Sequence, residues 1–138
     1  MNPYTVKIYY HHTDSGGVVY YGNYLSLLEE ARTAYLAGCG IDIKVFIGQG
    51  RFFVVSRQEL DYRSPARYGD TLSIQTTLNG YSGVRIDLGH TIFNQRGEMI
   101  AQARTVLAFI DTTFKPRPLP QELRQSLEAC MQKKGIDA

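Results

Sequence analysis

The chain has 138 residues, a length that accommodates one domain with one hydrophobic core. Charged residues make up 20% of it and hydrophobic residues 43%, which is ordinary for a folded domain and too apolar for a disordered one. The net charge of +2 is spread along the chain without a dense basic run, which argues against a nucleic-acid-binding protein. We therefore predict a single domain over residues 1–138 and no nucleic acid partner.

The cysteine content and the hydropathy pattern bear on the compartment. Cys39 and Cys130 are far apart in the sequence and lack the Cys-x-x-Cys spacing of a zinc site or a redox pair. Cysteine usage of this kind is typical of a reducing compartment. The N-terminal residues form no apolar run of signal-peptide length, and no stretch of about 18 consecutive apolar residues occurs elsewhere. The expectation is a cytoplasmic protein without stable membrane insertion.

In chain order, the first expected elements are a strand and a long helix. Residues 5–12 alternate between apolar and other side chains, which predicts a half-buried strand. A polar stretch with two glycines follows at residues 13–17. From about residue 20 to 36 apolar side chains recur at helical spacing over a wide arc, so this helix should be buried on most sides. Gly38 and Gly40 are expected to end it.

Beyond residue 50 the apolar period changes from that of a helix to that of a strand. Strands are predicted at residues 52–62, 72–78, 84–92 and 106–110. Turn-forming stretches separate them, and short connections of this kind predict an antiparallel meander. Pro120 then opens a short final helix. The predicted class is α+β, with an antiparallel sheet of about five strands wrapped around the long helix, because wrapping is the simplest way to bury that helix.

The stretch from Thr13 to Gly17 places a carboxylate and two glycines between a strand and a helix. A structural interpretation is that Asp14 satisfies turn or helix-start amides while the glycines adopt positive φ. A chemical interpretation is that Gly16 and Gly17 let a ligand approach the backbone, and that free N–H groups at the helix start stabilise a developing negative charge. A carboxylate beside such an oxyanion hole is typical of an acyl-transfer site. The local sequence leaves both interpretations open.

Other candidate chemistry is weaker. The Asp-Ser-Gly-Gly run at residues 14–17 imitates the nucleophile loop of trypsin-like proteases, but the chain is too short for that fold and lacks the required order of triad residues. No compact grouping of His, Cys and carboxylates predicts a metal site. His90 lies on the apolar face of a predicted strand and is expected to be a core histidine with a hydrogen-bond partner. His12 remains a candidate for a role near the reaction centre.

Three stretches of the sequence resemble one known family. Residues 9–25, which read YYHHTDSGGVVYYGNYL, are followed by Glu-Ala-Arg at residues 30–32. This pattern resembles the signature of the 4-hydroxybenzoyl-CoA thioesterase family, and most closely that of its Tol-Pal-associated acyl-CoA thioesterase branch. Residues 61–70 are similar to the second characteristic stretch of the family, and residues 115–120 to its C-terminal stretch. The resemblance thus extends over nearly the whole chain.

The resemblance implies a hotdog fold and an enzyme that hydrolyses acyl-CoA thioesters to a carboxylic acid and free CoA. It also implies homodimers or homotetramers with active sites at the subunit interface. Because a thioester already has a good leaving group, a carboxylate and a few oriented dipoles suffice without a metal or an organic cofactor. The acyl preference stays open, as does the choice between CoA and acyl carrier protein as the carrier.

The resemblance also assigns roles to residues. Asp14 matches the catalytic carboxylate of the family, which acts either as a nucleophile that forms a mixed anhydride or as a base for water. The backbone N–H of Tyr21 matches the group that polarises the thioester carbonyl in relatives, and the backbone of Gly22 is its neighbour. Several relatives have a histidine at the position of Tyr21. Since the backbone amide survives any side-chain change, the expected activity does not depend on that difference.

Further contacts to the substrate are expected around this centre. The predicted substrate-binding residues are Gly16, Gly17, Tyr24, His12 and Arg67. The arginines that offer partners for the phosphates of CoA are Arg57, Arg63, Arg67, Arg85 and Arg104. No cofactor and no metal are expected.

Two other functions remain open at this point. One is a hotdog dehydratase or hydratase acting on hydroxyacyl thioesters, whose relatives combine a histidine and an acidic residue in a different motif. The other is a protein that binds acyl thioesters or acyl carrier protein without turnover. Asp14 discriminates between them, because a pure binder does not need that carboxylate beside the helix start, whereas hydrolysis does.

Overall fold

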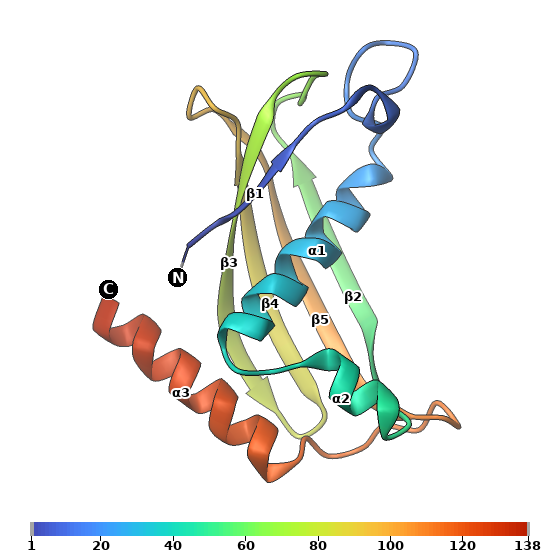
Figure 1. Cartoon of the computed structure of the whole chain (residues 1–138), viewed down its shortest axis with the longest axis vertical. Coiled ribbons are helices and arrows are strands. Elements are labelled where there is room, and N and C mark those ends of the chain that lie inside the picture. The colour runs from blue at the N-terminus through green and yellow to red at the C-terminus, as the bar shows by residue number, and fades with distance from the viewer. Residues whose placement is uncertain (1, 138) are drawn as a thin grey trace. The chain divides into compact units, whose positions relative to one another are not determined.

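A computed structural model of the chain describes residues 2–137 (Figure 1). The strands are β1 (Tyr4–Lys7), β2 (Arg51–Tyr62), β3 (Thr71–Ser82), β4 (Arg85–Phe93) and β5 (Met99–Asp111). The helices are η1 (Tyr10–His12, a single 3-10 turn), α1 (Asn23–Gly38), α2 (Ile43–Gly48) and α3 (Gln121–Asp137). No helix among the described residues has the length and apolar character needed to cross a bilayer.

The five strands form one antiparallel sheet in the order β1-β3-β4-β5-β2. β1 pairs with β3 so that Tyr4 lies opposite Ile74 and Lys7 opposite Thr71. The α+β class and the five strands are confirmed. The predicted meander of four consecutive strands holds for β3, β4 and β5 only, because β2 pairs with β5 and not with β3. The helical connection between β1 and β2 carries the chain from one edge of the sheet to the other, which local periodicity does not reveal.

Several elements also differ from the prediction, and β5 begins at Met99, seven residues before the predicted strand. The first strand ends at Lys7, and the next residues turn into η1, where the Tyr9 backbone N–H donates to Nδ1 of His12 at 2.8 Å. The short helix α2 was not predicted; it is capped by Asp42, whose carboxylate accepts the backbone N–H of Lys44. The final helix α3 has 17 residues, one more than α1, and is therefore longer than predicted.

The chain divides into two compact units, each assembled from three segments. The first unit comprises Met1–Tyr35, Glu59–Thr76 and His90–Ala103, and the second comprises Leu36–Gln58, Thr77–Gly89 and Arg104–Ala138.

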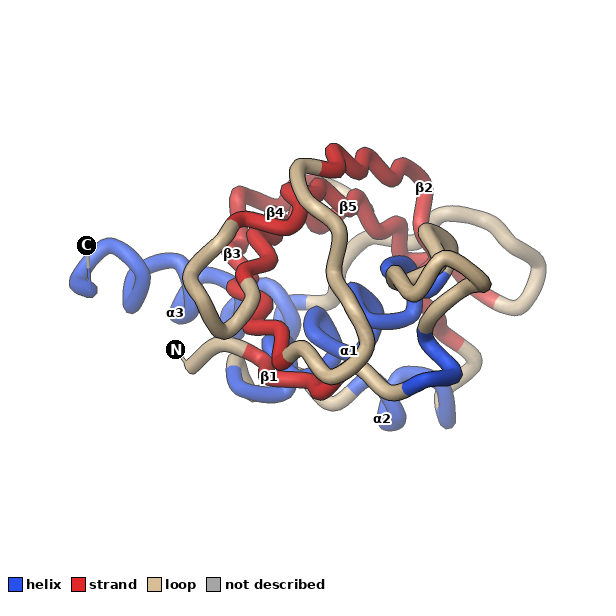
Figure 2. The backbone as a smooth tube through the Cα atoms, turned by 90° about the horizontal axis from the view of Figure 1, so that it is seen from above, coloured by secondary structure: helices blue, strands red, loops and turns tan. Residues whose placement is uncertain are grey.

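The core of the first unit lies between α1 and its strand segments. Figure 2 shows these strand segments following one another beside α1. Leu27 and Leu28 of α1 are almost fully buried, in one cluster with Leu72, Ile92 and Ile100 from three strands. Each such side chain stabilises the unit by roughly 1.5–3 kcal/mol through burial alone. The wide apolar arc of the predicted helix is thus accounted for, and the N-terminus of α1 is held in a fixed place.

The second unit has an aromatic and aliphatic core of its own. Phe109 of β5 is fully buried, and its ring centroid lies 5.0 Å from that of Phe53 and 5.6 Å from that of Phe46. Leu123 and Leu127 anchor α3 in this unit, with exposed fractions of 1% or less.

A disulfide within the second unit corrects the expectation drawn from the cysteines. Cys39, just after α1, is bonded to Cys130 in α3 across 91 residues of sequence, with the two Cα atoms 5.6 Å apart. Sequence spacing excludes close motifs such as Cys-x-x-Cys, but it carries no information on pairs that the fold brings together.

His90 is the core histidine that the sequence predicted. It is 3% exposed on β4, and its Nδ1 shares a hydrogen bond of 3.0 Å with the Thr76 hydroxyl of β3. Burial, together with the smaller effect of the positive charge of Arg32, lowers the pKa of His90 to about 4. The histidine is therefore neutral in the folded protein at pH 7.

Acidification should destabilise the protein through His90. The unfolded chain binds a proton at this residue near pH 6.5, whereas the folded chain does so only near pH 4, so the free energy of unfolding falls as the pH drops between these values. Lowering the pH from 6.5 to 5 should cost about 1.5 kcal/mol. Urea unfolding at several pH values measures this slope, and His90→Gln should flatten it. An equal slope in the variant would contradict the assignment.

Candidate active site

Asp14 sits in a tight turn that fixes one of its carboxylate oxygens. Its backbone N–H donates to the Val18 carbonyl at 2.9 Å, and the Gly17 N–H donates back to the Asp14 carbonyl at 3.1 Å. The Gly16 N–H donates to Oδ1 of the Asp14 side chain at 2.8 Å. Oδ2 accepts no hydrogen bond from any described residue, and the side chain is exposed. One oxygen thus orients the carboxylate, and the other is available to react.

Gly16 and Gly17 are each required in the turn for a different structural reason. Gly17 has φ of +79°, in the left-handed region that glycine adopts without steric cost. A Cβ at Gly16 would lie 3.2 Å from Oδ1 of Asp14 and would crowd the carboxylate. The structural interpretation of the loop is therefore confirmed for Asp14 and Gly17 and wrong for Gly16, which does not have a positive φ. The free Oδ2 leaves the chemical interpretation in place beside it.

Backbone contacts tie the turn to the start of α1. The Val19 N–H donates to the Ala66 carbonyl at 2.8 Å. The His12 carbonyl accepts both the Tyr20 N–H at 2.9 Å and the Asn23 side-chain amide at 2.7 Å. The segment that leads into α1 is thereby fixed at both ends.

Two consecutive backbone donors remain unused at this helix start. Within residues 2–137, the N–H groups of Tyr21 and Gly22 donate to no acceptor. Unpaired N–H groups at the beginning of a helix favour negative charge, since the peptide dipoles add along the axis. These are the two backbone groups that the family resemblance assigns to an oxyanion hole, and they lie in the same unit as Asp14.

A residue that the sequence did not single out contacts this helix start. The hydroxyl of Tyr62, at the end of β2, donates to the Tyr21 carbonyl at 3.2 Å. The ring of Tyr62 meets the ring of Tyr24 edge to face, with centroids 5.3 Å apart. Tyr62 stands in the second stretch of the family resemblance, and that position was the only signal in the sequence.

Two of the predicted substrate contacts, Tyr24 and His12, have side chains that are already engaged within the protein. Tyr24 is 3% exposed and belongs to the core cluster of the first unit, so it acts as a packing residue. His12 is half-buried, and its Nδ1 is occupied by the Tyr9 N–H. Burial, with the neighbouring His11, lowers the pKa of His12, which keeps its ring neutral. Nδ1 of His12 is therefore not free to act as a base.

Three of the five predicted phosphate-binding arginines differ in whether their side chains are already paired. Arg63 is paired with Asp61 at 2.8 Å, and Arg104 forms a two-pronged ion pair with Asp87. Arg67 is different, because its exposed side chain forms no ion pair or hydrogen bond with a described residue, although its charge helps to lower the pKa of Asp70. Its backbone forms a bridge with Val18, directly beside the Asp14 turn. Arg67 is thus the predicted arginine that this unit places next to the candidate site.

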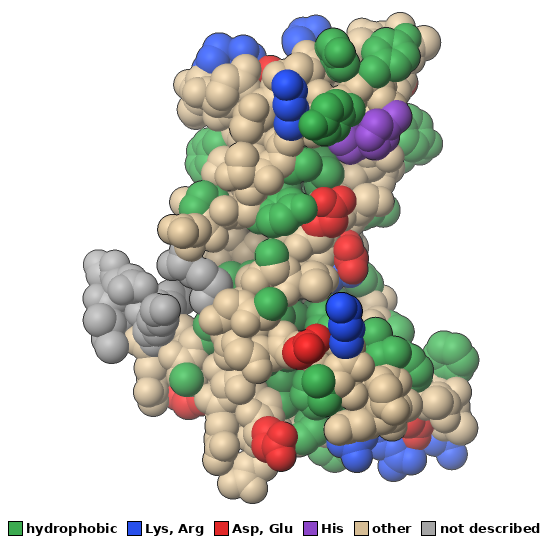
Figure 3. All heavy atoms as spheres, viewed as in Figure 1, with side chains coloured by type: hydrophobic (Ala, Val, Ile, Leu, Met, Phe, Trp, Pro, Cys, Tyr) green, Lys and Arg blue, Asp and Glu red, His purple; other side chains and the backbone are tan. Residues whose placement is uncertain are grey.

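The first unit exposes several tyrosine side chains. In the first unit, the exposed tyrosines are Tyr9, Tyr10, Tyr20, Tyr21, Tyr62 and Tyr68. Figure 3 shows histidine side chains next to hydrophobic ones where η1 and the following loop reach the surface. No group of three or more His, Cys, Asp and Glu side chains suited to a metal occurs among the described residues.

Comparison with known proteins identifies the family. A sequence profile described as the Thioesterase-like superfamily matches residues 9–127. The chain belongs to this superfamily. It is 32% identical to the acyl-CoA thioester hydrolase YbgC of Escherichia coli O157:H7 over 86% of this chain and 89% of that protein. It is 31% identical to the 1,4-dihydroxy-2-naphthoyl-CoA hydrolase of Synechococcus elongatus over 84% of this chain and 87% of that protein.

Solved structures of the superfamily share the fold. The DHNA-CoA thioesterase from Staphylococcus aureus superposes with a TM-score of 0.89 at 28% identity, covering 99% of this chain and 92% of that one. The 1,4-dihydroxy-2-naphthoyl-CoA thioesterase Slr0204 from Synechocystis gives a TM-score of 0.83 at 26% identity, with coverage of 91% and 94%. The hotdog fold and the acyl-CoA thioesterase family implied by the sequence motifs are confirmed.

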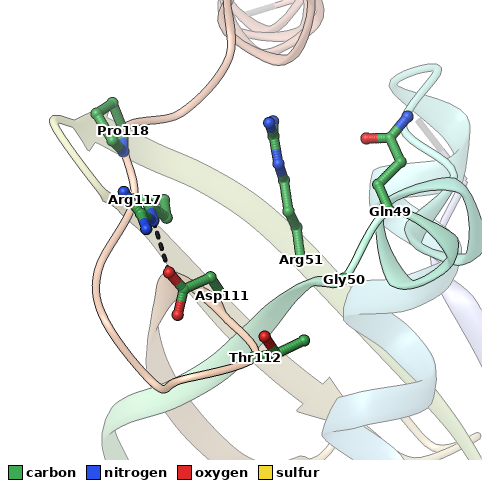
Figure 4. A pocket seen from close by; sticks show the side chains of 7 residues that line it. All are labelled: Gln49, Gly50, Arg51, Asp111, Thr112, Arg117 and Pro118. Carbon is green, nitrogen blue, oxygen red and sulfur yellow. Dashed lines mark hydrogen bonds and ion pairs between the residues drawn. The ribbon is translucent and has the colours of Figure 1, made fainter.

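A pocket of about 420 Å³ in the second unit contains none of the predicted site residues (Figure 4). Its lining residues are Gln49, Gly50, Arg51, Asp111, Thr112, Arg117 and Pro118. Oδ1 of Asp111 accepts the backbone N–H and the hydroxyl of Thr113, and Oδ2 accepts Nε of Arg117 at 2.7 Å. These bonds hold the pKa of Asp111 far below its usual range. A carboxylate so occupied anchors its loop and is unsuited to act as a base.

Proposed function

We propose that this chain hydrolyses acyl-CoA thioesters to a carboxylic acid and free CoA, with Asp14 as the catalytic carboxylate. The observation that carries the proposal is the free Oδ2 of Asp14 in the same unit as the unpaired N–H groups of Tyr21 and Gly22. A carboxylate and an oxyanion hole are the groups that acyl transfer requires. The acyl-CoA thioesterase relatives support the choice of a thioester as the acyl donor.

In the proposed reaction the thioester carbonyl oxygen accepts the Tyr21 and Gly22 N–H groups, which stabilise the negative charge of the tetrahedral intermediate. In one route Oδ2 of Asp14 attacks the carbonyl carbon, the C–S bond breaks and CoA leaves as a thiolate; water then hydrolyses the mixed anhydride. In the other route Oδ2 takes a proton from water as the water oxygen attacks the carbonyl carbon; the C–S bond then breaks, and the departing CoA thiolate takes the proton back from Asp14 and leaves the carboxylic acid. Both routes need the same ionised carboxylate, and the free Oδ2 is compatible with either.

The first experiment is thiol release from a panel of thioesters. The panel contains acetyl-, palmitoyl-, benzoyl- and 1,4-dihydroxy-2-naphthoyl-CoA, together with one acyl carrier protein ester. Turnover of at least one CoA ester is expected, and the profile defines the acyl class and the carrier. Tight binding of acyl-CoA without turnover on any ester would overturn the proposal in favour of a non-catalytic binding protein.

We also propose that residues 1–138 form one domain that assembles into a homodimer or homotetramer. The superfamily match over residues 9–127 runs through both units, which supports a single domain. β2 is a 12-residue edge strand with mostly exposed residues, and such edges pair readily with a second copy. Light scattering coupled to size exclusion measures the mass in solution.

A cytoplasmic location is the remaining part of the proposal. A CoA ester substrate supports it. The Cys39–Cys130 disulfide argues against it, because disulfides are rare in the reducing cytoplasm. Trapping thiols in intact cells with an alkylating reagent decides the point, since a cytoplasmic protein should carry two alkylated cysteines.

Arg67→Gln should weaken the binding of CoA esters. The exposed guanidinium beside the Asp14 turn can pair with a phosphate of CoA. A neutral glutamine side chain binds a phosphate more weakly than a guanidinium does. We expect KM to rise by roughly 3- to 10-fold with kcat nearly unchanged. The ester of pantetheine, which lacks the nucleotide phosphates, should show no change in KM. Arg63→Gln is the matched control, because Arg63 is already paired with Asp61. Equal effects of both variants would contradict the assignment.

A further inference from the structure

We propose that Tyr62 is a positioning residue for the oxyanion hole, acting through its hydrogen bond to the Tyr21 carbonyl. The proposal rests on the function proposed above. The oxygen that accepts the Tyr62 hydroxyl at 3.2 Å belongs to the peptide unit that joins Tyr21 to Gly22. The N–H group of that same peptide unit is the unpaired donor of Gly22. Tyr62 therefore acts on one of the two oxyanion donors through a single planar group.

The physical link is the electronic structure of the amide. The peptide C–N bond has partial double-bond character, so its six atoms lie close to a plane and share their electron density. A hydrogen bond to the carbonyl oxygen draws density toward that oxygen and makes the N–H on the opposite side a stronger donor, which is the cooperativity of hydrogen-bonded chains. The Tyr62 bond should therefore strengthen the Gly22 N–H when it donates to the substrate oxyanion.

The bond also fixes the direction in which the Gly22 N–H points. The Tyr21 carbonyl accepts a second donor, the Tyr24 N–H of the first turn of α1, at 3.3 Å. One donor comes from the helix and the other from β2, so the peptide plane between Tyr21 and Gly22 is held from two elements. Without the Tyr62 hydroxyl only the longer bond remains. An oxyanion hole stabilises charge best when its donors are oriented before the reaction begins.

The ring of Tyr62 is held independently of its hydroxyl. It packs edge to face on the ring of Tyr24, with the centroids 5.3 Å apart, and Tyr24 is itself buried in the core. Burial and the neighbouring Tyr21 raise the pKa of Tyr62, so the hydroxyl keeps its proton and remains a donor at neutral pH. Phenylalanine at this position should therefore keep the packing and remove only the donor.

Tyr62→Phe is the variant that tests the role, with Tyr68→Phe as its control. Tyr68 lies in the same unit with an exposed edge-to-face ring contact to Tyr10, and its hydroxyl donates to no described residue. We expect Tyr62→Phe to lower kcat by roughly 3- to 10-fold, the worth of one ordinary hydrogen bond, with KM within about twofold of wild type. Tyr68→Phe should leave both parameters unchanged.

A second measurement distinguishes a hydrogen-bond donor from a residue that only supports folding. Incorporating 3-fluorotyrosine at position 62 alone makes the hydroxyl more acidic and so a stronger donor while preserving the ring packing. Assayed at pH 6, where the hydroxyl stays protonated, this protein should have a kcat equal to or above that of wild type and well above that of Tyr62→Phe. The fluorotyrosine protein also tests the role if Tyr62→Phe folds poorly, because it keeps the ring packing.

The outcomes separate this proposal from the function on which it rests. If wild type releases thiol, and Tyr62→Phe matches Tyr68→Phe in kcat, the positioning role is wrong while the thioesterase function stands. A kcat that falls equally in Tyr62→Phe and in the fluorotyrosine protein would also overturn the role, because donor strength would then be irrelevant. If wild type releases no thiol from any ester, the proposed function fails first, and the role of Tyr62 fails with it.

Discussion

Asp14→Asn is expected to lower kcat for acyl-CoA hydrolysis by roughly 10²- to 10⁴-fold, the usual contribution of a catalytic acid, base or nucleophile. The asparagine side chain keeps an oxygen that accepts the Gly16 N–H, so the turn should survive. The substitution removes the negatively charged second oxygen, Oδ2, and puts an amide nitrogen in its place. That nitrogen neither attacks a carbonyl carbon nor removes a proton from water. Steady-state thiol release measures kcat and KM together, and KM should change little.

The chain contains a matched control for this substitution. Asp42 caps α2, and its Oδ1 accepts the backbone N–H of Lys44, two residues later, at 3.0 Å. Asp14 makes the same kind of bond, because its Oδ1 accepts the N–H of Gly16, also two residues later. Asp42→Asn therefore repeats the chemical change in the same type of turn, in a residue outside the proposed site. Full activity in Asp42→Asn together with its loss in Asp14→Asn supports the assignment. If Asp14→Asn retained more than about a tenth of the wild-type kcat, Asp14 would not be the catalytic carboxylate.

The local structure of the candidate site was predictable from the sequence where its parts are close along the chain. Asp14, Gly16 and Gly17 stand in one five-residue stretch between a predicted strand and a predicted helix, and the glycines indicated both the turn and the space beside it. The periodicity of the next segment predicted a helix from about residue 20, near the observed start of α1 at Asn23, and the family resemblance assigned the backbone groups of Tyr21 and Gly22. Local pattern suffices here because turns and helix starts are determined by residues only a few positions apart.

The contacts that sequence analysis missed join distant residues. The bond from Tyr62 to the Tyr21 carbonyl spans 41 positions, and Cys39 and Cys130 are separated by 91. Alternating apolar residues predict that a segment is a strand but contain no information on its neighbour in the sheet, which is why β2 was placed beside β3. Tyr24, which we predicted as a substrate contact, lies in the core cluster, where its helical spacing along α1 also places it.

Opening the Cys39–Cys130 disulfide should lower the free energy of unfolding by about 2–4 kcal/mol. The bond closes a loop of 91 residues, and the loss of chain entropy in the unfolded state grows with loop length, although only logarithmically. The loss should appear as a lower urea midpoint when the oxidised protein is compared with the same protein kept in a thiol reductant. The double variant Cys39→Ser, Cys130→Ser should match the reduced protein and should not respond to the reductant.

Reduction should leave the chemistry intact. Neither cysteine belongs to the proposed site, so kcat measured well below the unfolding midpoint should be the same for the oxidised and reduced protein. α3 keeps Leu123 and Leu127 in the core of the second unit without the bond, because both side chains are almost fully buried. The disulfide therefore adds stability to a helix that is already docked. Equal midpoints for the oxidised protein and the double variant would contradict this account, since the crosslink would then contribute nothing to the folded state.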